Sequence, residues 1–398
     1  MKSRIKRFLK TMLKLTFPML VFVVAAELLC SIAARWQYGT TDVVKLNELS
    51  TGNAYLAELG EKSWGAAITP HPYLGWVRNE ETLLTYGERV NNVGLIGRDF
   101  PLERDPSTFT ILLTGGSVAE QFNRTGHLER ILNESGKFNK PVVVLNGATG
   151  SYAEPHQAIV TLLYGEVVDA IITIEMTNEF QRLAGGGHVR LEYPHNQSFL
   201  RANPVSRHGF DVLGAAWQSN ELKNLSISWP SRAVFYATRG ARQSLVNRYE
   251  SAEPDDDTLK RFFSLPEEWS RQQVADFNIE QNKKYWRSIR ALGQLHGFKQ
   301  AHFLQPSPAR GKVLTVEEKQ RLDASNFNPQ QQVAEYEYMS GSLLKMNDEG
   351  VPVFNLQEVF ADVSDEVYTD TVHCTDHGYE IMARAITEKV IPLWSEDG

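Results

Sequence analysis

Residues 110–120 read Thr-Ile-Leu-Leu-Thr-Gly-Gly-Ser-Val-Ala-Glu, a short apolar run that ends in two glycines and a serine. Such a run is typical of a buried strand, and the residues after the glycines can open a helix. Because glycine has no side chain to obstruct a tight turn, the hydroxyl of Ser117 can stand at the carboxyl end of a sheet. The free N–H groups of the helix start can hold a developing anion there. The tripeptide alone is more often only a loop, so a nucleophile needs further residues to support it.

Strands and helices alternate on both sides of this stretch. We expect strands at 109–114, 141–145, 168–174, 301–304 and 351–355. We expect helices at 118–133, 152–164, 267–295, 330–348 and 380–389. This alternation predicts an α/β fold with a central parallel sheet and helices on both faces. Sites in such sheets lie at the carboxyl ends of the strands, where Ser117 and two asparagine-containing turns after the next strands fall.

Composition limits the classes of function. The 398 residues are 42% hydrophobic, enough for a large core, and the net charge of −7 argues against a nucleic-acid-binding protein. The two cysteines, Cys30 and Cys374, rule out a disulfide framework. The sequence gives no indication of the oligomeric state.

The N-terminus is basic and then apolar. Residues 1–14 carry six lysines and arginines and no acid, and residues 15–34 are apolar apart mainly from Pro18 and Glu27. About 20 apolar residues can span a bilayer, and the basic flank stays in the cytoplasm. We therefore expect a basic tail at 1–14 and a transmembrane anchor at 15–34, in the inner membrane of a bacterium, with the rest of the chain outside the cytoplasm. The alternative is a cleaved signal peptide with its processing site near Ser31–Ala34.

The remaining chain divides into a lead-in and a large domain. Residues 35–105 read as a stalk or lead-in, and residues 106–398 as the α/β domain. Within this domain the pattern weakens over about 181–265, where prolines at 194, 204 and 230 interrupt any long helix. This insertion is interpreted as a lid or side subdomain, or as a surface excursion without a role in substrate binding.

A second set of candidate residues lies near the C-terminus, in Asp370-Thr371-Val372-His373. A serine hydroxyl needs a base to become a nucleophile, and a histidine base needs a carboxylate to fix its tautomer. Asp370 and His373 can supply both from one loop. The candidate donors for an oxyanion are the N–H of Ser117, a backbone N–H in Gly150-Ser151 and the side-chain amide of Asn178. Each of these residues alone would more often be a cap or turn residue, so the prediction depends on their joint occurrence.

With these residues the sequence resembles the SGNH (GDSL-type) hydrolase superfamily, over about 109–174 and 301–391. The resemblance implies a flavodoxin-like three-layer α/β/α fold and a catalytic triad of Ser117, His373 and Asp370, with Asn178 as an oxyanion donor. His373, Asp376, Gly378 and Tyr379 strengthen it. Three positions depart from the family pattern: Gly116 replaces the acid before the serine, Ser151 occupies the usual glycine position, and Met176-Thr177-Asn178-Glu179 replaces Gly-x-Asn-Asp.

The resemblance implies a membrane-anchored serine esterase that removes O-acyl groups, such as acetyl, from a carbohydrate or glycoconjugate. The substrate is then an acylated carbohydrate or lipid. One alternative is an O-acyltransferase of cell-surface polysaccharide with the same triad, and another is a non-catalytic glycan-binding or assembly factor. No cofactor is implied, and the spacing of the histidines at 71, 127, 156, 195 and 302 does not indicate a metal site.

Overall fold

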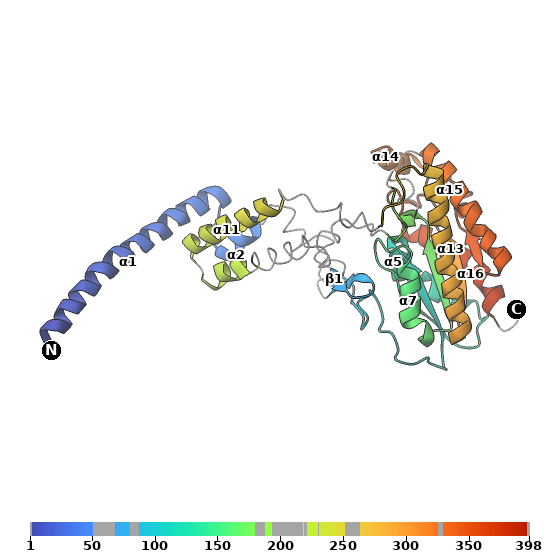
Figure 1. Ribbon diagram of the computed structural model, residues 1–398, viewed down its shortest axis with the longest axis horizontal. Helices are drawn as coiled ribbons and strands as arrows, with labels where there is room; N and C mark the ends of the chain where they lie inside the picture. Colours follow the sequence, from blue (N-terminus) through green and yellow to red (C-terminus); the bar gives the residue numbers. More distant parts are fainter. Residues whose placement is uncertain are drawn as a thin grey trace. The chain divides into compact units, whose positions relative to one another are not determined.

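The chain forms two compact units, Met1–Ala66 with Ser198–Asp256, and Ala67–Gln197 with Asp257–Gly398 (Figure 1). The computed structural model describes residues 2–50, 68–79, 87–179, 188–192, 218, 221–229, 231–250, 263–324 and 329–395. The lead-in expected at 35–105 and the insertion expected at 181–265 are each shared between the two units.

The larger unit is built on a five-stranded parallel sheet. Its strands are β3 (Phe109–Gly115), β4 (Val142–Asn146), β5 (Ala170–Glu175), β6 (Lys299–Leu304) and β7 (Val353–Asn355). They are arranged in the order β4-β3-β5-β6-β7, and every neighbouring pair is parallel. This order, 2-1-3-4-5 along the chain, is that of flavodoxin-like folds. The fold class predicted from the sequence is confirmed.

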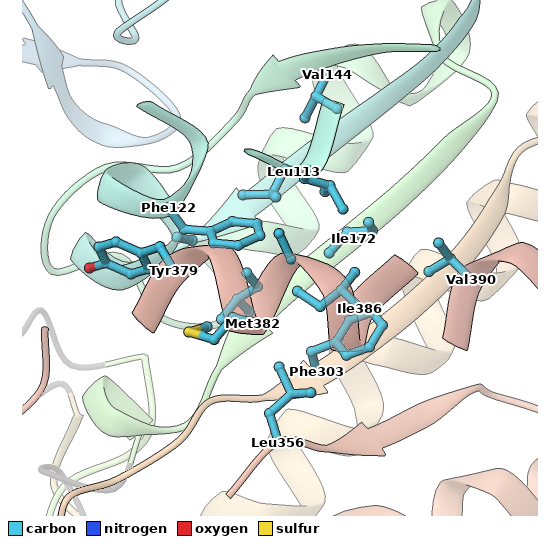
Figure 2. Close-up of a cluster of buried hydrophobic side chains, with 14 of the residues drawn as sticks. Leu113, Phe122, Val144, Ile172, Phe303, Leu356, Tyr379, Met382, Ile386 and Val390 are labelled. Atoms are coloured by element: carbon cyan, nitrogen blue, oxygen red, sulfur yellow. The ribbon is translucent and has the colours of Figure 1, made fainter. Parts of the chain in front are cut away.

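One face of the sheet is covered by α5 (Ser117–Arg124), α6 (His127–Glu134) and α16 (Asp376–Trp394). Alternate strand residues such as Leu113, Ile172 and Phe303 point into this layer and are fully buried against Phe122 and Met382 (Figure 2). This cluster is the main hydrophobic core. It joins the helix that begins at Ser117 to the C-terminal helix that follows His373.

The other face carries α7 (His156–Tyr164), α13 (Arg271–His296) and α15 (Pro329–Leu344). Here the alternate residues of the strands include polar ones. The indole of Trp286 stacks on the imidazole of His302 at 4.4 Å, and His302 Nδ1 lies 2.9 Å from the hydroxyl of Thr173. Burial lowers the pKa of His302 to about 3, so this imidazole is neutral.

The structure corrects several element boundaries. The helix expected at 118–133 is two helices, because the chain turns at Gly126, whose φ of +68° is in the left-handed region. A 3₁₀ turn, η2 (Lys345–Glu349), ends the helix expected at 330–348. The sequence did not indicate α14 (Val316–Ala324), nor that 68–78 form a hairpin of β1 (Ile68–His71) and β2 (Gly75–Arg78).

The smaller unit is helical in its described part. It contains α1 (Lys2–Tyr38), α2 (Val43–Ser50), α11 (Arg232–Glu250) and a helix over residues 221–228. Ala34, Val43, Leu46 and Phe235 form its buried centre. The insertion was expected to lack long helices, yet α11 has 19 residues and begins just after the last of the three prolines. Within α1, Thr16–Tyr38 is long and apolar enough to cross a membrane.

Candidate active site

Ser117 stands at the carboxyl end of strand β3, as the first residue of α5. The turn before it requires glycine at two positions. Gly115 has a φ of +148°, and a Cβ there would collide with the carbonyl oxygen of Ile174. A Cβ at Gly116 would collide with the side-chain amide nitrogen of Asn178. The two glycines therefore let the start of α5 approach the neighbouring strand β5 and the loop that follows it.

The structure brings together the three residues expected to form a triad. Nε2 of His373 lies 2.8 Å from Oγ of Ser117, and Nδ1 lies 2.7 Å from Oδ2 of Asp370. Oδ1 of Asp370 accepts the backbone N–H groups of Val372 and His373, each at 2.8 Å. The geometry is that of a nucleophile, a base and an orienting carboxylate.

The electrostatics of Asp370 fix the direction of these hydrogen bonds. Burial alone would raise the pKa of Asp370, but hydrogen bonds from the His373 ring and from the backbone N–H groups of His373 and Val372 outweigh it and lower the pKa to about 2. An ionised carboxylate only accepts hydrogen bonds, so Nδ1 of His373 carries the proton. Nε2 is then free to accept the hydroxyl hydrogen of Ser117.

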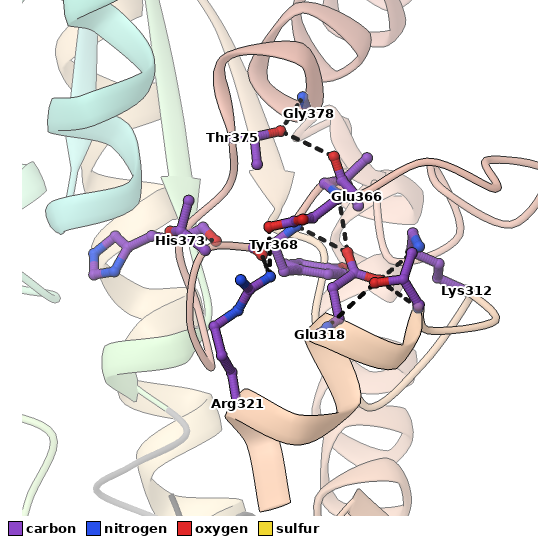
Figure 3. Close-up of polar contacts among 11 residues, drawn as sticks. Lys312, Glu318, Arg321, Glu366, Tyr368, His373, Thr375 and Gly378 are labelled. Carbon is purple, nitrogen blue, oxygen red and sulfur yellow. Dashed lines mark hydrogen bonds and ion pairs between the residues drawn. The ribbon is translucent and has the colours of Figure 1, made fainter. Parts of the chain in front are cut away.

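Asp370 and His373 lie on a short hairpin. The backbone N–H of Thr369 donates to the carbonyl of His373 at 2.9 Å, and that of Thr375 donates to Val367 at 2.8 Å. Arg321 on α14 donates to the carbonyl of Tyr368 at 2.9 Å. These bonds hold the two ends of the hairpin together and fix its base to a neighbouring helix (Figure 3).

A buried ion pair supports the same hairpin at the chain segment that leads into it. Lys312 Nζ lies 2.7 Å from the Glu318 carboxylate, and both side chains are fully buried. The carboxylate also accepts the backbone N–H groups of Thr315, Val367 and Tyr368 at 2.8–3.0 Å (Figure 3). Every oxygen of Glu318 is thus satisfied, which a buried charge requires. The pair anchors residues 367–368, which enter the hairpin just before Asp370.

The oxyanion candidates are partly accounted for. The N–H of Gly150 donates to the carboxylate of Glu120 at 3.0 Å, so of the two groups expected in Gly150-Ser151 only that of Ser151 is left to donate. Ser151 has a φ of +65°, in the left-handed region. Asn178 Nδ2 donates to the carbonyl of Tyr152 at 2.6 Å, which leaves its second amide hydrogen. The N–H of Ser117 is at the first helical position and needs no partner within α5.

Glu120 links the start of α5 to this loop, a role that the sequence did not indicate. Its carboxylate forms a bidentate pair with Arg78 of β2, at 2.7–2.9 Å, and both side chains are buried. It also accepts the hydroxyl of Thr149 at 3.3 Å and the N–H of Gly150. The signal in the sequence that could have indicated this role is the charge of Glu120 on an otherwise apolar helix face.

Three buried carboxyl groups lie beside the carboxyl end of β5. Glu179 accepts the N–H groups of Met176 and Glu154, and Glu175 accepts the indole N–H of Trp286 at 3.0 Å. Burial and the neighbouring charge of Glu179 raise the pKa of Glu175 to about 8. Burial and the charge of Glu175 raise the pKa of Glu154 well above its usual value. Glu154 and Glu175 are therefore mainly protonated at neutral pH.

Among the residues that the structure describes, no group of three or more His, Cys, Asp or Glu side chains is arranged to hold a metal ion. Two of the histidines considered from the sequence have polar partners of their own. His127 Nε2 lies 2.9 Å from Asp376, and His156 Nδ1 lies 2.8 Å from the carbonyl of Ala153. His195 lies outside the described residues.

No protein-family model and no curated protein matches the chain. Several solved structures are similar to it. An acetyl xylan esterase matches 71% of this chain and 99% of its own, with 10% identity and a TM-score of 0.37. A proposed SGNH hydrolase from Slackia heliotrinireducens matches 71% of this chain and 98% of its own, with 13% identity and a TM-score of 0.31.

An acetyl xylan esterase from Geobacillus stearothermophilus also matches, with 72% of this chain and 96% of its own covered, 10% identity and a TM-score of 0.29. At such TM-scores the likeness adds nothing to the inference of activity, which depends on the geometry around Ser117.

Proposed function

We propose that this chain is a membrane-anchored serine esterase of the SGNH type that removes O-acyl groups from a carbohydrate or glycoconjugate outside the cytoplasm. The observation that carries the proposal is the hydrogen-bonded series Ser117–His373–Asp370, with both distances below 3 Å. Acyl transfer requires a nucleophile, a base and an orienting carboxylate in this order. Here they come from segments 256 positions apart and meet at the carboxyl end of a parallel sheet.

In the proposed reaction, Oγ of Ser117 attacks the acyl carbonyl carbon and its proton passes to Nε2 of His373. The oxyanion is held by the N–H groups of Ser117 and Ser151 and by the amide of Asn178. The tetrahedral intermediate expels the sugar alcohol, which takes the proton from His373 and leaves the acyl group on Ser117. Water then loses a proton to His373 and attacks the acyl-enzyme. Release of the carboxylic acid returns the proton to Ser117, while Asp370 stays ionised throughout.

The anchor in this proposal is α1. Within Thr16–Tyr38, an 18-residue window has a mean hydropathy of 2.2 and is almost wholly exposed within the chain. The basic residues before it favour a cytoplasmic N-terminus in a bacterial inner membrane, with the larger unit on the opposite side. The exterior of that membrane is where acylated polysaccharides and lipids are met, which supports the substrate class that the sequence resemblance implies.

The test is hydrolysis of an aryl acetate and of an O-acetylated oligosaccharide by the detergent-solubilised chain, with Ser117→Ala as the control variant. The proposal predicts release of acetate from both substrates by the wild type and none by the variant. An acyltransferase would instead divert the acetyl group when an unacetylated acceptor glycan is added. Binding of the glycan without acetate release from either substrate would favour a non-catalytic factor.

A further inference from the structure

The helix α1 changes character at Glu27, the middle residue of its apolar stretch Thr16–Tyr38. Residues 16–25 are exposed all round, whereas from Ala26 onward one side of α1 is covered by α2 and α11. The opposite side stays apolar and exposed at Leu28, Leu29, Ile32 and Trp36. These four residues, here called the outer face of α1, lie on one side of the helix because of their three- and four-residue spacing.

Glu27 fixes the insertion to α1 at this level. Its carboxylate accepts the hydroxyl of Ser231 at 2.6 Å and the backbone N–H groups of Arg232 and Ala233 at 3.0 and 3.1 Å. The Arg232 guanidinium adds an ion pair at 3.1 Å. Glu27 thus caps the first turn of α11, where unpaired N–H groups and the helix dipole favour a negative charge. A carboxylate within an apolar helix is tolerated when it is paired in this way.

The length of α1 places this junction inside a bilayer. From Thr16 to Glu27 the helix rises only about 18 Å, whereas the hydrocarbon core is about 30 Å thick. Toward the N-terminus, the apolar stretch is limited by Lys10 and Lys14. The hydrocarbon must therefore reach beyond Glu27, to the part of α1 on which the insertion is packed. The outer face of α1 supplies the apolar surface that contact with the hydrocarbon requires.

The insertion has surface features that fit the same environment. Trp229 lies two residues before Ser231, hence at the level of Glu27, and its side chain is 66% exposed. Helix α11 carries Arg232, Arg239, Arg242 and Arg248 against a single acid, Glu250. The Arg239 guanidinium lies over the ring of Tyr38, at 5.4 Å from its centroid. In membrane proteins, exposed tryptophan lies nearer the lipid tails and arginine lies nearer the phosphate groups.

We propose that α2, α11 and the helix over residues 221–228 form a membrane-embedded collar around the outer half of α1. In this arrangement Trp229 and the outer face of α1 contact acyl chains of the outer leaflet, and Arg239, which lies over Tyr38 at the end of α1, is among its phosphate groups. The insertion then has a lipid bilayer as its partner. This inference deepens the proposed anchor and rests on it, since a collar requires that α1 enters the membrane.

The test uses the full chain in phospholipid vesicles, with Cys30→Ser as background and the fluorophore bimane on one introduced cysteine. Cys374 does not compete for the label, because it is buried and burial raises the pKa of its thiol. Bimane is placed at Val21→Cys in the apolar stretch and at Trp229→Cys in the insertion. Vesicles contain lipid with a doxyl quencher near the headgroup, or deep in the acyl chain, or none.

The collar predicts a loss of fluorescence at both positions, Trp229→Cys and Val21→Cys, in vesicles that contain a quencher, and none in vesicles without it. Quenching at Val21→Cys without any at Trp229→Cys would overturn the collar and leave the anchor standing. Absence of quenching at both positions would overturn the anchor itself. Should Trp229→Cys fail to fold, Ser228→Cys, an exposed and nearly isosteric change next to Trp229, distinguishes the same outcomes.

Discussion

Nε2 of His373 lies 2.8 Å from Oγ of Ser117, although the two residues are 256 positions apart in the chain. The contact is made because α5, which begins at Ser117, and α16, which follows His373, pack in one hydrophobic layer on the same face of the sheet. Tyr379 of α16 also donates a hydrogen bond from its hydroxyl to Gln121 of α5 at 3.1 Å. The hydroxyl of Ser117 and the imidazole of His373 are therefore brought together by the core.

Replacing Asp370 by asparagine should lower kcat for an aryl acetate on the order of 10³–10⁴-fold, because an amide can stabilise the wrong tautomer of the imidazole. Asp376→Asn is the matched control, since Asp376 is exposed and bonded to His127. The pKa of Asp370 of about 2 means that its carboxylate stays ionised down to that pH. A fall in the rate of Asp376→Asn as large as that of Asp370→Asn would remove the assigned role.

Arg78→Met should lower kcat by up to about 100-fold with a smaller change in KM, because the unpaired Glu120 would no longer hold Gly150 and its neighbour Ser151 in place. Arg78→Lys keeps the charge and should restore part of the rate. A purely structural role would instead reduce the fraction of active enzyme and leave kcat per active site unchanged, which active-site titration would reveal. That result would contradict the positioning role.

Glu318→Ala should destabilise the larger unit by about 3–5 kcal/mol, because it leaves the buried Lys312 charge without its partner. Urea denaturation measures the change. Glu358→Ala is the control, since its pair with Arg310 is exposed and should contribute less than about 1 kcal/mol. Equal effects of the two substitutions would contradict the importance of the buried pair.

The same residue gives a pH dependence. Burial opposes ionisation of Glu318, but hydrogen bonds from Lys312 and from the backbone of Thr315, Val367 and Tyr368 outweigh it and lower its pKa below 4.5. A lowered pKa in the folded state means that the stabilisation is present above about pH 4.5 and is lost as the pH falls further. The free energy of unfolding of the wild type should therefore fall on acidification more steeply than that of Glu318→Ala.

Glu175 changes the stability with pH in the opposite direction to Glu318. Its pKa, raised to about 8 by burial and by Glu179, means that folding favours the protonated carboxyl group. This contribution is present below about pH 4.5 and is lost as the pH rises through 8. Glu175→Gln cannot ionise, and its amide could still accept from Trp286 and donate to Oδ1 of Asn282, which has no partner among the described residues.

Thermal unfolding between pH 6 and pH 9 therefore separates the two proteins. The wild type should lose stability over this range, whereas Glu175→Gln should lose less and be the more stable form at pH 9. Identical pH profiles of the melting temperature would show that Glu175 is already ionised in the folded state.

The parallel sheet, and the proximity of Ser117, His373 and Asp370, could be predicted from sequence because their signals are local. The strands β3, β4 and β5 are mostly apolar, as a strand buried on both faces requires. The glycines before Ser117 and the three-residue spacing of Asp370 and His373 each define a turn by themselves. The fold then brings the carboxyl ends of β3 and β5 to one edge, so the candidate residues meet there.

The supporting ion pairs could not be predicted, because a charged residue is solvated by default. Arg78 and Glu120 are 42 residues apart, and Glu318 reaches the strand at Val367 over 49 residues. Only the packed structure shows that these carboxylates are buried and paired. Helix α11 could not be predicted for another reason: its apolar face is narrow and interrupted by arginines, and it packs on α1, far away in sequence.

The central claim is that Ser117 is a nucleophile activated by His373. Labelling of the full chain with a fluorophosphonate probe tests it most directly, followed by peptide mapping of the modified residue. We expect one modified residue, Ser117, with labelling abolished in Ser117→Ala and strongly slowed in His373→Ala. Labelling that persists in Ser117→Ala, or that is absent from a folded wild type, would contradict the account.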